Sequence, residues 1–270
     1  MISHLYIYPI KSLGAVSLQK AVLEKEGLRG DRRFVIVDAQ GKFITQRTRP
    51  ELTRFVLSES ATGFIVQDSL TNKAKELSWE PDLGSWISVE IWEDSLQAPE
   101  VLEGWSEWFS TALGEEVKLV RLSEEKPRSM KSKYQTELAK NTSFADSLPL
   151  LVVGSGSYAA LEDHLNDRVD RLRFRPNIIV ATQEPFLEDT WAEIQVGETR
   201  LFGAKPCARC PLVNVDPHSG ESDKRMLKTL ASFRTLNHKV YFGQQFVPIS
   251  LGSLQVGMNV QVIRSQDAIY

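Results

Sequence analysis

Short apolar runs separated by turn-forming residues recur along this 270-residue chain. Phe34-Val35-Ile36-Val37 precedes the turn-like residues 38–42, and Phe43-Ile44-Thr45 follows, which predicts a strand, a turn and a returning strand. Similar runs occupy residues 64–66, 87–92, 148–153, 177–180 and 254–262. Strands and long helices do not alternate regularly, which disfavours a parallel α/β sheet. The pattern predicts an α+β, β-rich fold of β-barrels with flanking helices.

A few segments carry helical spacing instead. Trp105, Trp108, Phe109 and Ala112 recur on one face of residues 105–113, and Gly114 stands where it can end the helix. Further apolar stripes predict helices from about residue 157 and over residues 222–233. We expect the aromatic side chains of the first helix to belong to the core rather than to a cofactor platform.

The charge balance excludes several classes of protein. The chain has 32 basic and 35 acidic residues, a net charge of −3, so no overall field favours nucleic acid or an anionic membrane. No run approaches the roughly 18 apolar residues that span a bilayer. The first nine residues alternate like a strand and lack the pattern of a signal peptide. Two cysteines cannot build a secreted disulfide framework, so we expect a soluble, cytoplasmic protein.

The length suits one large domain or two of ordinary size. Residues 123–141 are polar and densely charged, which is typical of a solvated connection. We therefore predict an N-terminal domain over residues 1–122 and a second domain over residues 123–270.

The two cysteines of the chain, Cys207 and Cys210, lie three positions apart with Arg209 between them. A thiolate suits a soft metal or redox chemistry, and an adjacent guanidinium favours the ionised form of either sulfur. Zinc would need further ligands that the four unpaired histidines do not supply. A redox dithiol would need to begin a helix, whereas residues 211–215 predict a strand. Packing of both cysteines in the core remains the alternative.

Basic residues gather in three other places. Lys11 and Ser12 follow the first strand, residues 27–33 form a glycine-bracketed turn with three arginines, and residues 171–177 carry three more. The arginines at 171, 173 and 175 would share a face if that segment were extended. Arginine binds phosphate or carboxylate in a bidentate manner, although runs of charge are also typical of solvated surfaces. The glycines of Gly154-Ser155-Gly156 lack the remainder of a phosphate-loop motif and predict a turn with a helix cap.

Five short motifs together resemble the MOSC-domain proteins that carry an N-terminal MOSC β-barrel domain. They are Tyr8-Pro9-Ile10-Lys11-Ser12, Gly30-Asp31-Arg32-Arg33-Phe34, Arg173-Phe174-Arg175-Pro176-Asn177, Cys207-Ala208-Arg209-Cys210 and Val215-Asp216-Pro217-His218-Ser219-Gly220. They occur in the family's order and at similar separations. The chain is thus similar to the mitochondrial amidoxime-reducing components and their bacterial relatives over nearly its whole length.

The resemblance implies a pterin-based molybdenum cofactor with Cys210 as the metal ligand. It also implies a set of cofactor-binding residues: Lys11, Ser12, Arg32, Arg33, Arg175, Asn177 and Arg209. Arginine side chains can bind the phosphate of such a cofactor in a bidentate manner, and a thiolate is a suitable soft ligand for its metal. We take Cys210 and Asp216 as the catalytic candidates, the latter as a proton donor beside His218, although residues 216–220 are also typical of a plain turn.

The resemblance further implies an oxidoreductase that reduces N-hydroxylated compounds such as amidoximes, hydroxylamines and N-hydroxylated base analogues. No cysteine follows Cys210, so electrons would come from a separate protein, either a reductase or a small iron–sulfur or haem carrier. One alternative is a non-catalytic carrier of the molybdenum cofactor or of persulfide sulfur. Another is a non-redox domain that binds a different phosphorylated ligand.

Overall fold

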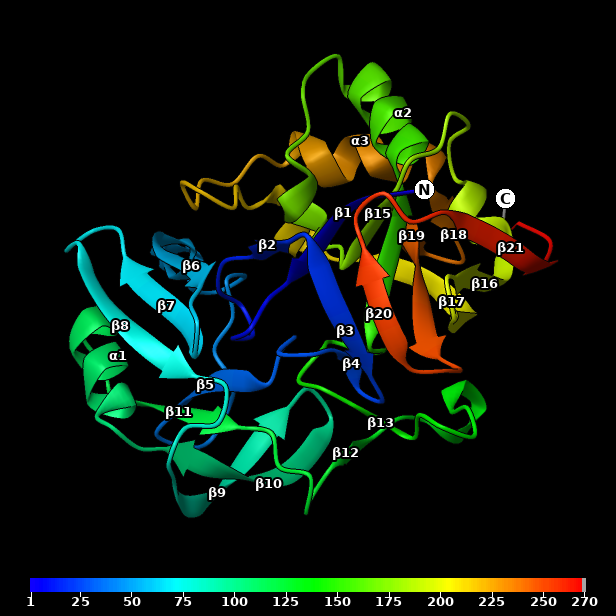
Figure 1. The fold of residues 1–270 in the computed structure, drawn as a ribbon. Helices are drawn as coiled ribbons and strands as arrows, with labels where there is room; N and C mark the ends of the chain where they lie inside the picture. The colour runs from blue at the N-terminus through cyan, green and yellow to red at the C-terminus, as the bar shows by residue number, and fades with distance from the viewer. Residues whose placement is uncertain (269–270) are drawn as a thin grey trace.

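The computed structural model describes residues 1–268 and is rich in strands (Figure 1). The largest sheet follows the order β2 (Val16–Leu18), β1 (Ile2–Ile7), β15 (Ile178–Val180), β14 (Leu150–Gly154), β19 (Lys239–Pro248), β17 (Thr199–Arg209), β16 (Trp191–Val196) and β21 (Val260–Ser265), with β18 (Thr235–Leu236) paired to β19. Most neighbours are antiparallel, and β14 with β15 is parallel. The α+β, β-rich class predicted from the sequence is confirmed.

The remaining strands form smaller sheets. One follows the order β5 (Phe34–Asp38), β11 (Val117–Arg121), β10 (Asp94–Val101) and β9 (Leu83–Ile91). The others are β20 (Gly252–Gln255) with β3 (Lys20–Glu24) and β4 (Gly27–Leu28); β6 (Phe55–Glu59) with β7 (Gly63–Asp68) and β8 (Lys73–Ser78); and β12 (Arg128–Ser129) with β13 (Asn141–Thr142). Each of these pairings runs along an open path, so within residues 1–268 the strand order traces no closed barrel.

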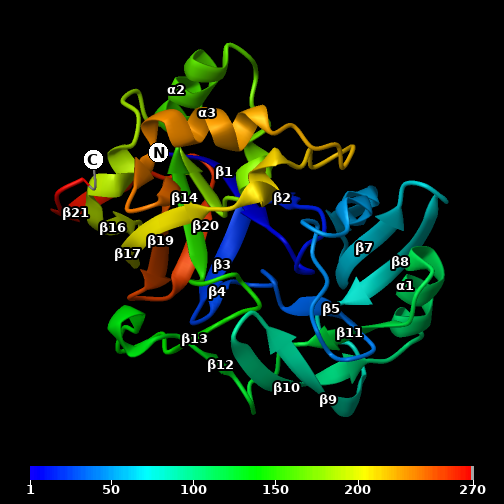
Figure 2. The same ribbon diagram turned by 180° about the vertical axis from the view of Figure 1, so that it is seen from behind.

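Three α-helices lie in the described part of the chain: α1 (Trp105–Leu113), α2 (Ser155–Leu165) and α3 (Arg225–Phe233). Helices α2 and α3 cover one end of the large sheet, whereas α1 packs beside β11 and β8 (Figures 1 and 2). Short 3₁₀ turns are η1 (Pro50–Arg54), η2 (Ser132–Tyr134), η3 (Arg171–Phe174), η4 (Leu187–Thr190) and η5 (Pro211–Asn214). No helix within residues 1–268 combines the length and apolar character needed to cross a membrane.

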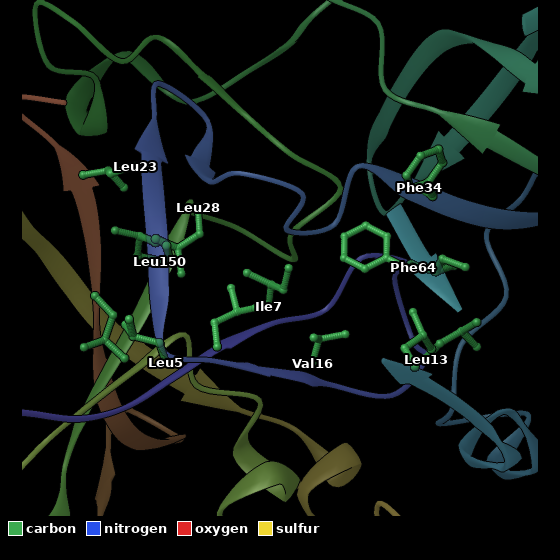
Figure 3. Close-up of a cluster of buried hydrophobic side chains, with 14 of the residues drawn as sticks. Leu5, Ile7, Leu13, Val16, Leu23, Leu28, Phe34, Phe64 and Leu150 are labelled. Atoms are coloured by element: carbon green, nitrogen blue, oxygen red, sulfur yellow. The ribbon is translucent and has the colours of Figure 1, made fainter. Parts of the chain in front are cut away.

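The beginning of the chain is built into the sheet of its second half. Strand β1 pairs with β15, with Leu5 opposite Ile178, and β3 pairs with β20. The hydrophobic core also joins the two halves of the chain. Leu150 of β14 packs among Leu5, Leu23 and Leu28 (Figure 3). The domain boundary between residues 122 and 123 stays a prediction. Strands within residues 2–28 pair with strands of the second predicted domain.

Helix α1 begins and ends where its sequence pattern predicts. Gly114 adopts a left-handed conformation at φ 70°, and its N–H donates to the carbonyl of Ser110. Trp105 and Phe109 are fully buried beside Phe55, which confirms their expected place in the core. Aromatic spacing plus a terminal glycine was enough to define this helix.

One local expectation was wrong, and one condition stated for the sequence was not met. Residues 211–215 are not a strand, because Pro211 opens the 3₁₀ turn η5 directly after β17. The arginine segment is not extended either: the Asp170 carboxylate accepts a hydrogen bond from the Leu172 amide and caps η3. Residues 254–262 carry parts of the strands β20 and β21 with a turn between them, as their apolar pattern predicts; β20 pairs with β3 and β21 with β16.

Candidate functional site

A cavity of about 310 Å³ lies where the loop after β1, the end of η3 and the end of β17 meet. Most of the site residues predicted from the sequence line it: Lys11, Ser12, Arg32, Arg175, Asn177, Arg209 and Cys210. They come from three stretches of the chain, residues 11–32, 175–177 and 209–210. The pairing of β1 with β15, and of β17 with β19, holds these segments together.

The cavity wall carries a large excess of positive charge. Among the described residues, its ionised side chains are the cations Lys11, Arg32, Arg47, Arg175, Lys205 and Arg209 and the single carboxylate of Asp146. Arg47, Arg175, Lys205 and Arg209 have no carboxylate within 4.0 Å in residues 1–268. Cations held together without acids favour an anionic ligand, because an anion lowers their mutual repulsion.

Cys210 owes its position to a change of backbone direction. Strand β17 ends at Arg209, Cys210 keeps an extended backbone at φ −121°, and Pro211 then starts η5. The side chain is half-buried and lines the cavity. The Nη1 atom of Arg47 lies 4.0 Å from its Sγ atom. A nearby guanidinium stabilises a thiolate, the form that binds a metal.

Cys207 lies in a different environment from Cys210. It is 9% exposed and packs with Val153, Phe174 and Phe242. Arg209 donates from Nη1 to its sulfur at 3.0 Å and from Nη2 to the Phe174 carbonyl at 2.7 Å. The arginine between the two cysteines therefore contacts the first of them. Arg47, which is distant in sequence, is the cation beside the second.

Lys11 is buried and forms an ion pair with Asp146 at the cavity wall. Its ammonium also donates to the Phe144 carbonyl at 2.8 Å. Burial lowers the pKa of Lys11 to about 8, although the Asp146 carboxylate opposes that shift. Desolvation alone would raise the pKa of Asp146, but the Lys11 ammonium, Arg47 and the Trp92 N–H outweigh it and hold that pKa well below its usual range.

Two guanidinium groups flank the buried ring of Tyr8. The Cζ atoms of Arg32 and Arg175 lie 4.5 and 4.1 Å from its centroid. Arg32 is neutralised by Asp31, at 2.6 Å, whereas Arg175 donates to the Leu13 carbonyl, at 2.8 Å. Burial, followed by the repulsion of Arg32, lowers the pKa of Arg175 to about 10, so it stays charged at neutral pH.

Two buried nitrogens of the cavity arginines have no hydrogen-bond partner in the described structure. They are the Nη2 atom of Arg175 and the Nε atom of Arg209. A buried polar group without a partner costs about 1–3 kcal/mol. Both residues line the cavity, so a ligand with acceptor oxygens would supply what the protein leaves unsatisfied.

Asn177 lines the cavity but uses most of its amide within the protein. Its Oδ1 accepts from the Leu151 amide at 3.1 Å and from Arg32 at 3.2 Å. Its Nδ2 donates to the Tyr6 carbonyl at 3.2 Å. The side chain thus connects β14, β1 and Arg32, and its first effect is to hold the wall in place.

Two predicted site residues lie elsewhere. Arg33 points away from the cavity and contacts Glu24 and Glu26, at 2.8 and 3.5 Å. Asp216 accepts from the amides of His218 and Ser219 and pairs with Arg173 at 2.7 Å, outside the cavity lining. These contacts describe a salt-bridged surface and a capped turn.

The fold also brings to the cavity several residues that were not predicted from the sequence: Arg47, Trp92, Asp146, Ser147 and Lys205. Arg47 lies over the Trp92 ring, with 3.9 Å between its Cζ atom and the centroid, and Trp92 donates to Asp146 at 3.2 Å. Of these residues, Lys205 alone could have been selected from the sequence, because it lies two positions before Cys207. The others stand in loops whose sequence gives no sign of the site.

Residues 1–268 contain no group of three or more His, Cys, Asp or Glu side chains that could together hold a metal ion. A metal that arrives with ligands of its own needs only one protein donor. Cys210, with its sulfur on the cavity wall, can be that donor.

The cavity of this β-rich fold is lined by Cys207, Cys210 and six cationic side chains, which defines the class of a domain with a site suited to an anionic ligand. Residues 1–116 match the MOSC N-terminal beta barrel domain, and residues 139–261 match the MOSC domain. The chain therefore belongs to the MOSC-domain proteins that carry the N-terminal MOSC domain.

Several characterised proteins are similar to this chain. The mitochondrial amidoxime-reducing component 1 of Mus musculus is 29% identical over 97% of this chain and 82% of its own length. The Homo sapiens protein of the same name is 26% identical over the same shares. The molybdenum cofactor sulfurase of Oryza sativa is 29% identical over 88% of this chain, which spans only 31% of that longer protein.

Solved structures are less similar. The YUAD protein of Bacillus subtilis matches 96% of this chain and 92% of its own, with 9% identity and a TM-score of 0.43. That likeness is too weak to define the fold.

Proposed function

We propose that the cavity binds the molybdenum cofactor, with the Cys210 thiolate as the protein ligand of the metal. The observation that carries the proposal is a half-buried cysteine in a wall of six cations, four of which have no carboxylate within 4.0 Å in residues 1–268. The relatives named for amidoxime reduction and for molybdenum cofactor sulfuration support it.

The donor set fits such a group. Arg175 and Arg209 each present an unsatisfied buried nitrogen, as a phosphate would require. Ser12 and Gln245 add polar side chains to the same wall, where a pterin edge needs donors and acceptors. Arg33 lies outside the cavity, so we do not include it among the binding residues.

We further propose that the loaded protein reduces N-hydroxylated compounds such as amidoximes. The N–O bond breaks, two electrons and two protons are taken up, and the oxygen leaves as water. When bound, the cofactor supplies the two-electron redox chemistry. The electrons come from a separate donor protein, a reductase or a small iron–sulfur or haem carrier.

Residues of the chain would stabilise the thiolate, orient the phosphate and transfer protons. Arg47 stabilises the Cys210 thiolate, and Arg175 and Arg209 orient the phosphate. Asp216, our first candidate for proton transfer, is engaged with Arg173 away from the cavity. The Lys11–Asp146 pair is a better candidate, because it lies in the cavity wall and Lys11 holds a proton at neutral pH.

The experiment compares Cys210→Ala with Cys207→Ala, expressed in a host that makes the cofactor. Elemental analysis measures molybdenum, and a benzamidoxime assay with reduced methyl viologen measures turnover. We expect Cys210→Ala to lose both, since it removes the thiolate, and Cys207→Ala to retain most of each. Loss of metal in the Cys207 variant alone would make the ligand assignment wrong.

The same assay separates the enzyme from a carrier of cofactor or persulfide sulfur. A carrier would contain molybdenum or a persulfide and give no reduction with any electron donor. Protein with neither molybdenum nor a persulfide would instead indicate a non-redox domain for another phosphorylated ligand.

A further inference from the structure

A wide cleft of about 1210 Å³, here called the outer cleft, adjoins the cavity that contains Cys210. The two spaces share one stretch of wall: Thr45, Arg47, Trp92, Asp146, Ser147, Leu148 and Lys205. A molecule that reaches Cys210 past this shared wall also contacts the outer cleft. The side chains of the outer cleft therefore contribute to the substrate specificity of the site.

Three lysines gather on one side of the outer cleft around Tyr134. The Nζ atoms of Lys133 and Lys205 each lie 4.9 Å from the Tyr134 ring centroid, so they are at most 9.8 Å apart. Lys131 precedes η2, and its carbonyl accepts from the Tyr134 amide. The ammonium of Lys205 donates to the Ser147 hydroxyl at 2.7 Å. Two segments distant in sequence thus bring their positive charges to the same ring.

These lysines have no acidic partner. Within residues 1–268 no carboxylate lies within 4.0 Å of Lys131, Lys133 or Lys205. Desolvation, together with the charges of Lys131 and Lys133, keeps the pKa of Lys205 below its ordinary value, although Tyr134 and Cys207 oppose part of this. An anion between these ammonium groups would relieve the repulsion among them.

Most acids of the outer cleft are engaged elsewhere. Asp94 pairs with Arg128, Glu115 with Arg49, and Asp146 with Lys11. The Asp38 carboxylate accepts from the backbone amides of residues 40 and 42. Glu90 and Glu93 stand on and just after β9, on a different segment from η2. The lysine cluster is therefore a distinct positive region of the cleft.

We propose that Lys131, Lys133 and Lys205 form an anion subsite that holds the phosphate or carboxylate group of a substrate whose reacting end faces Cys210. The identity of that reacting end, an N-hydroxylated nitrogen, rests on the function proposed above. The subsite adds the class of substrate, namely compounds that carry an anionic group. Neutral amidoximes would bind without this contact, and more weakly.

The test measures binding rather than turnover. Isothermal titration calorimetry follows phenyl phosphate, benzoate and neutral benzyl alcohol on the purified full chain, with its molybdenum content recorded. Lys131→Gln/Lys133→Gln removes two charges that line only the outer cleft, so metal content should not change. We expect phenyl phosphate to bind about tenfold more weakly to this variant, with benzyl alcohol unaffected.

Two matched variants act as controls. Lys20→Gln/Lys25→Gln removes the same net charge from residues outside the outer cleft and should bind phenyl phosphate as the natural chain does. Lys131→Arg/Lys133→Arg keeps the charge and should retain most of the affinity. Raising the salt concentration should weaken phosphate binding by the natural chain and affect the Gln variant less.

Three results would overturn the subsite. One is equal affinity of the natural chain and Lys131→Gln/Lys133→Gln for both anions, and another is equal weakening in the Lys20/Lys25 control. The third is unchanged anion binding with weaker binding of an acidic electron-donor protein, which would assign the lysines to protein docking. Failure of molybdenum loading with the lysine effect intact would instead overturn the cofactor proposal alone. Preference for phenyl phosphate or for benzoate then identifies the anionic group.

Discussion

The Nη1 atom of Arg47 lies 4.0 Å from the Sγ atom of Cys210, although 163 positions separate the two residues. Arg209, the immediate neighbour of Cys210, instead contacts Cys207 at 3.0 Å. The two sulfurs therefore have different cationic partners. Arg47 is held over Trp92, and Trp92 donates to Asp146, so a chain of contacts fixes the cation beside the proposed metal ligand.

Replacing Arg47 should make Cys210 less reactive. A charge at 4 Å in an environment close to water contributes about 1 kcal/mol, so Arg47→Met should slow alkylation of the thiolate about fivefold. The measurement is the rate of iodoacetamide labelling of Cys210 by peptide mass spectrometry, on protein from a cofactor-deficient host. Arg49→Met is the control, because Arg49 pairs with Glu51 and Glu115. Equal rates in all three proteins would contradict the assignment.

Replacing Arg175 should separate cofactor binding from stability. Within residues 1–268 its buried charge has no carboxylate within 4.0 Å, and its Nη2 atom has no hydrogen-bond partner. We expect Arg175→Met to lose most of its molybdenum while the cofactor-free protein changes in stability by no more than about 1 kcal/mol. Elemental analysis and urea unfolding measure the two effects. Arg173→Met, outside the cavity, should keep its metal. Full loading of the Arg175 variant would exclude this guanidinium from the site.

Lys11 should make stability rise with pH above 8. Its pKa is about 8 in the folded chain against an ordinary 10.5, so between these values the unfolded state binds more protons. Stability therefore increases with pH in that window, and burial of the charge costs up to about 3 kcal/mol below it. Urea unfolding between pH 7.5 and 9.5 should show a steeper rise for the natural chain than for Lys11→Met. Parallel profiles would mean that Lys11 is not the responsible group.

Glu188 should have the opposite dependence. Its side chain is fully buried, and desolvation raises its pKa to about 7 from 4.5, although the Ser157 hydroxyl donates to both of its oxygens. The folded state binds more protons between these values, so the contribution of Glu188 to stability is greatest below pH 4.5 and falls as the pH rises toward 7.

The total loss from this group is about 3 kcal/mol. Glu188→Gln should remove it, as thermal or urea unfolding between pH 5 and 7.5 would measure. Glu184→Gln, an exposed position three residues before η4, should keep the profile of the natural chain. An unchanged slope in the Glu188 variant would contradict a buried, protonated carboxyl.

Local chemistry in the sequence was enough to define many elements and part of the site. The spacing of Trp105 and Phe109 with a glycine after them predicted α1 and its end. The alternation of the first nine residues predicted β1, and continuous apolar runs predicted β5 and β14, since burial in a sheet depends on local pattern. The cysteine motif and the resemblance to MOSC-domain proteins selected Cys210, Arg175 and Arg209, which line one cavity.

Only the tertiary structure decided which cation lies beside which sulfur. Arg47, Asp146 and Trp92 reach the cavity because strand pairing brings distant loops together, and no local pattern encodes that proximity. Tertiary structure also decided that Arg33 and Asp216 lie outside the cavity lining. Arg33 pairs with Glu24, and Asp216 pairs with Arg173. Sequence determines which groups are available and the local turns that carry them. Their distances depend on long-range pairing, because charge interactions act through space and not along the chain.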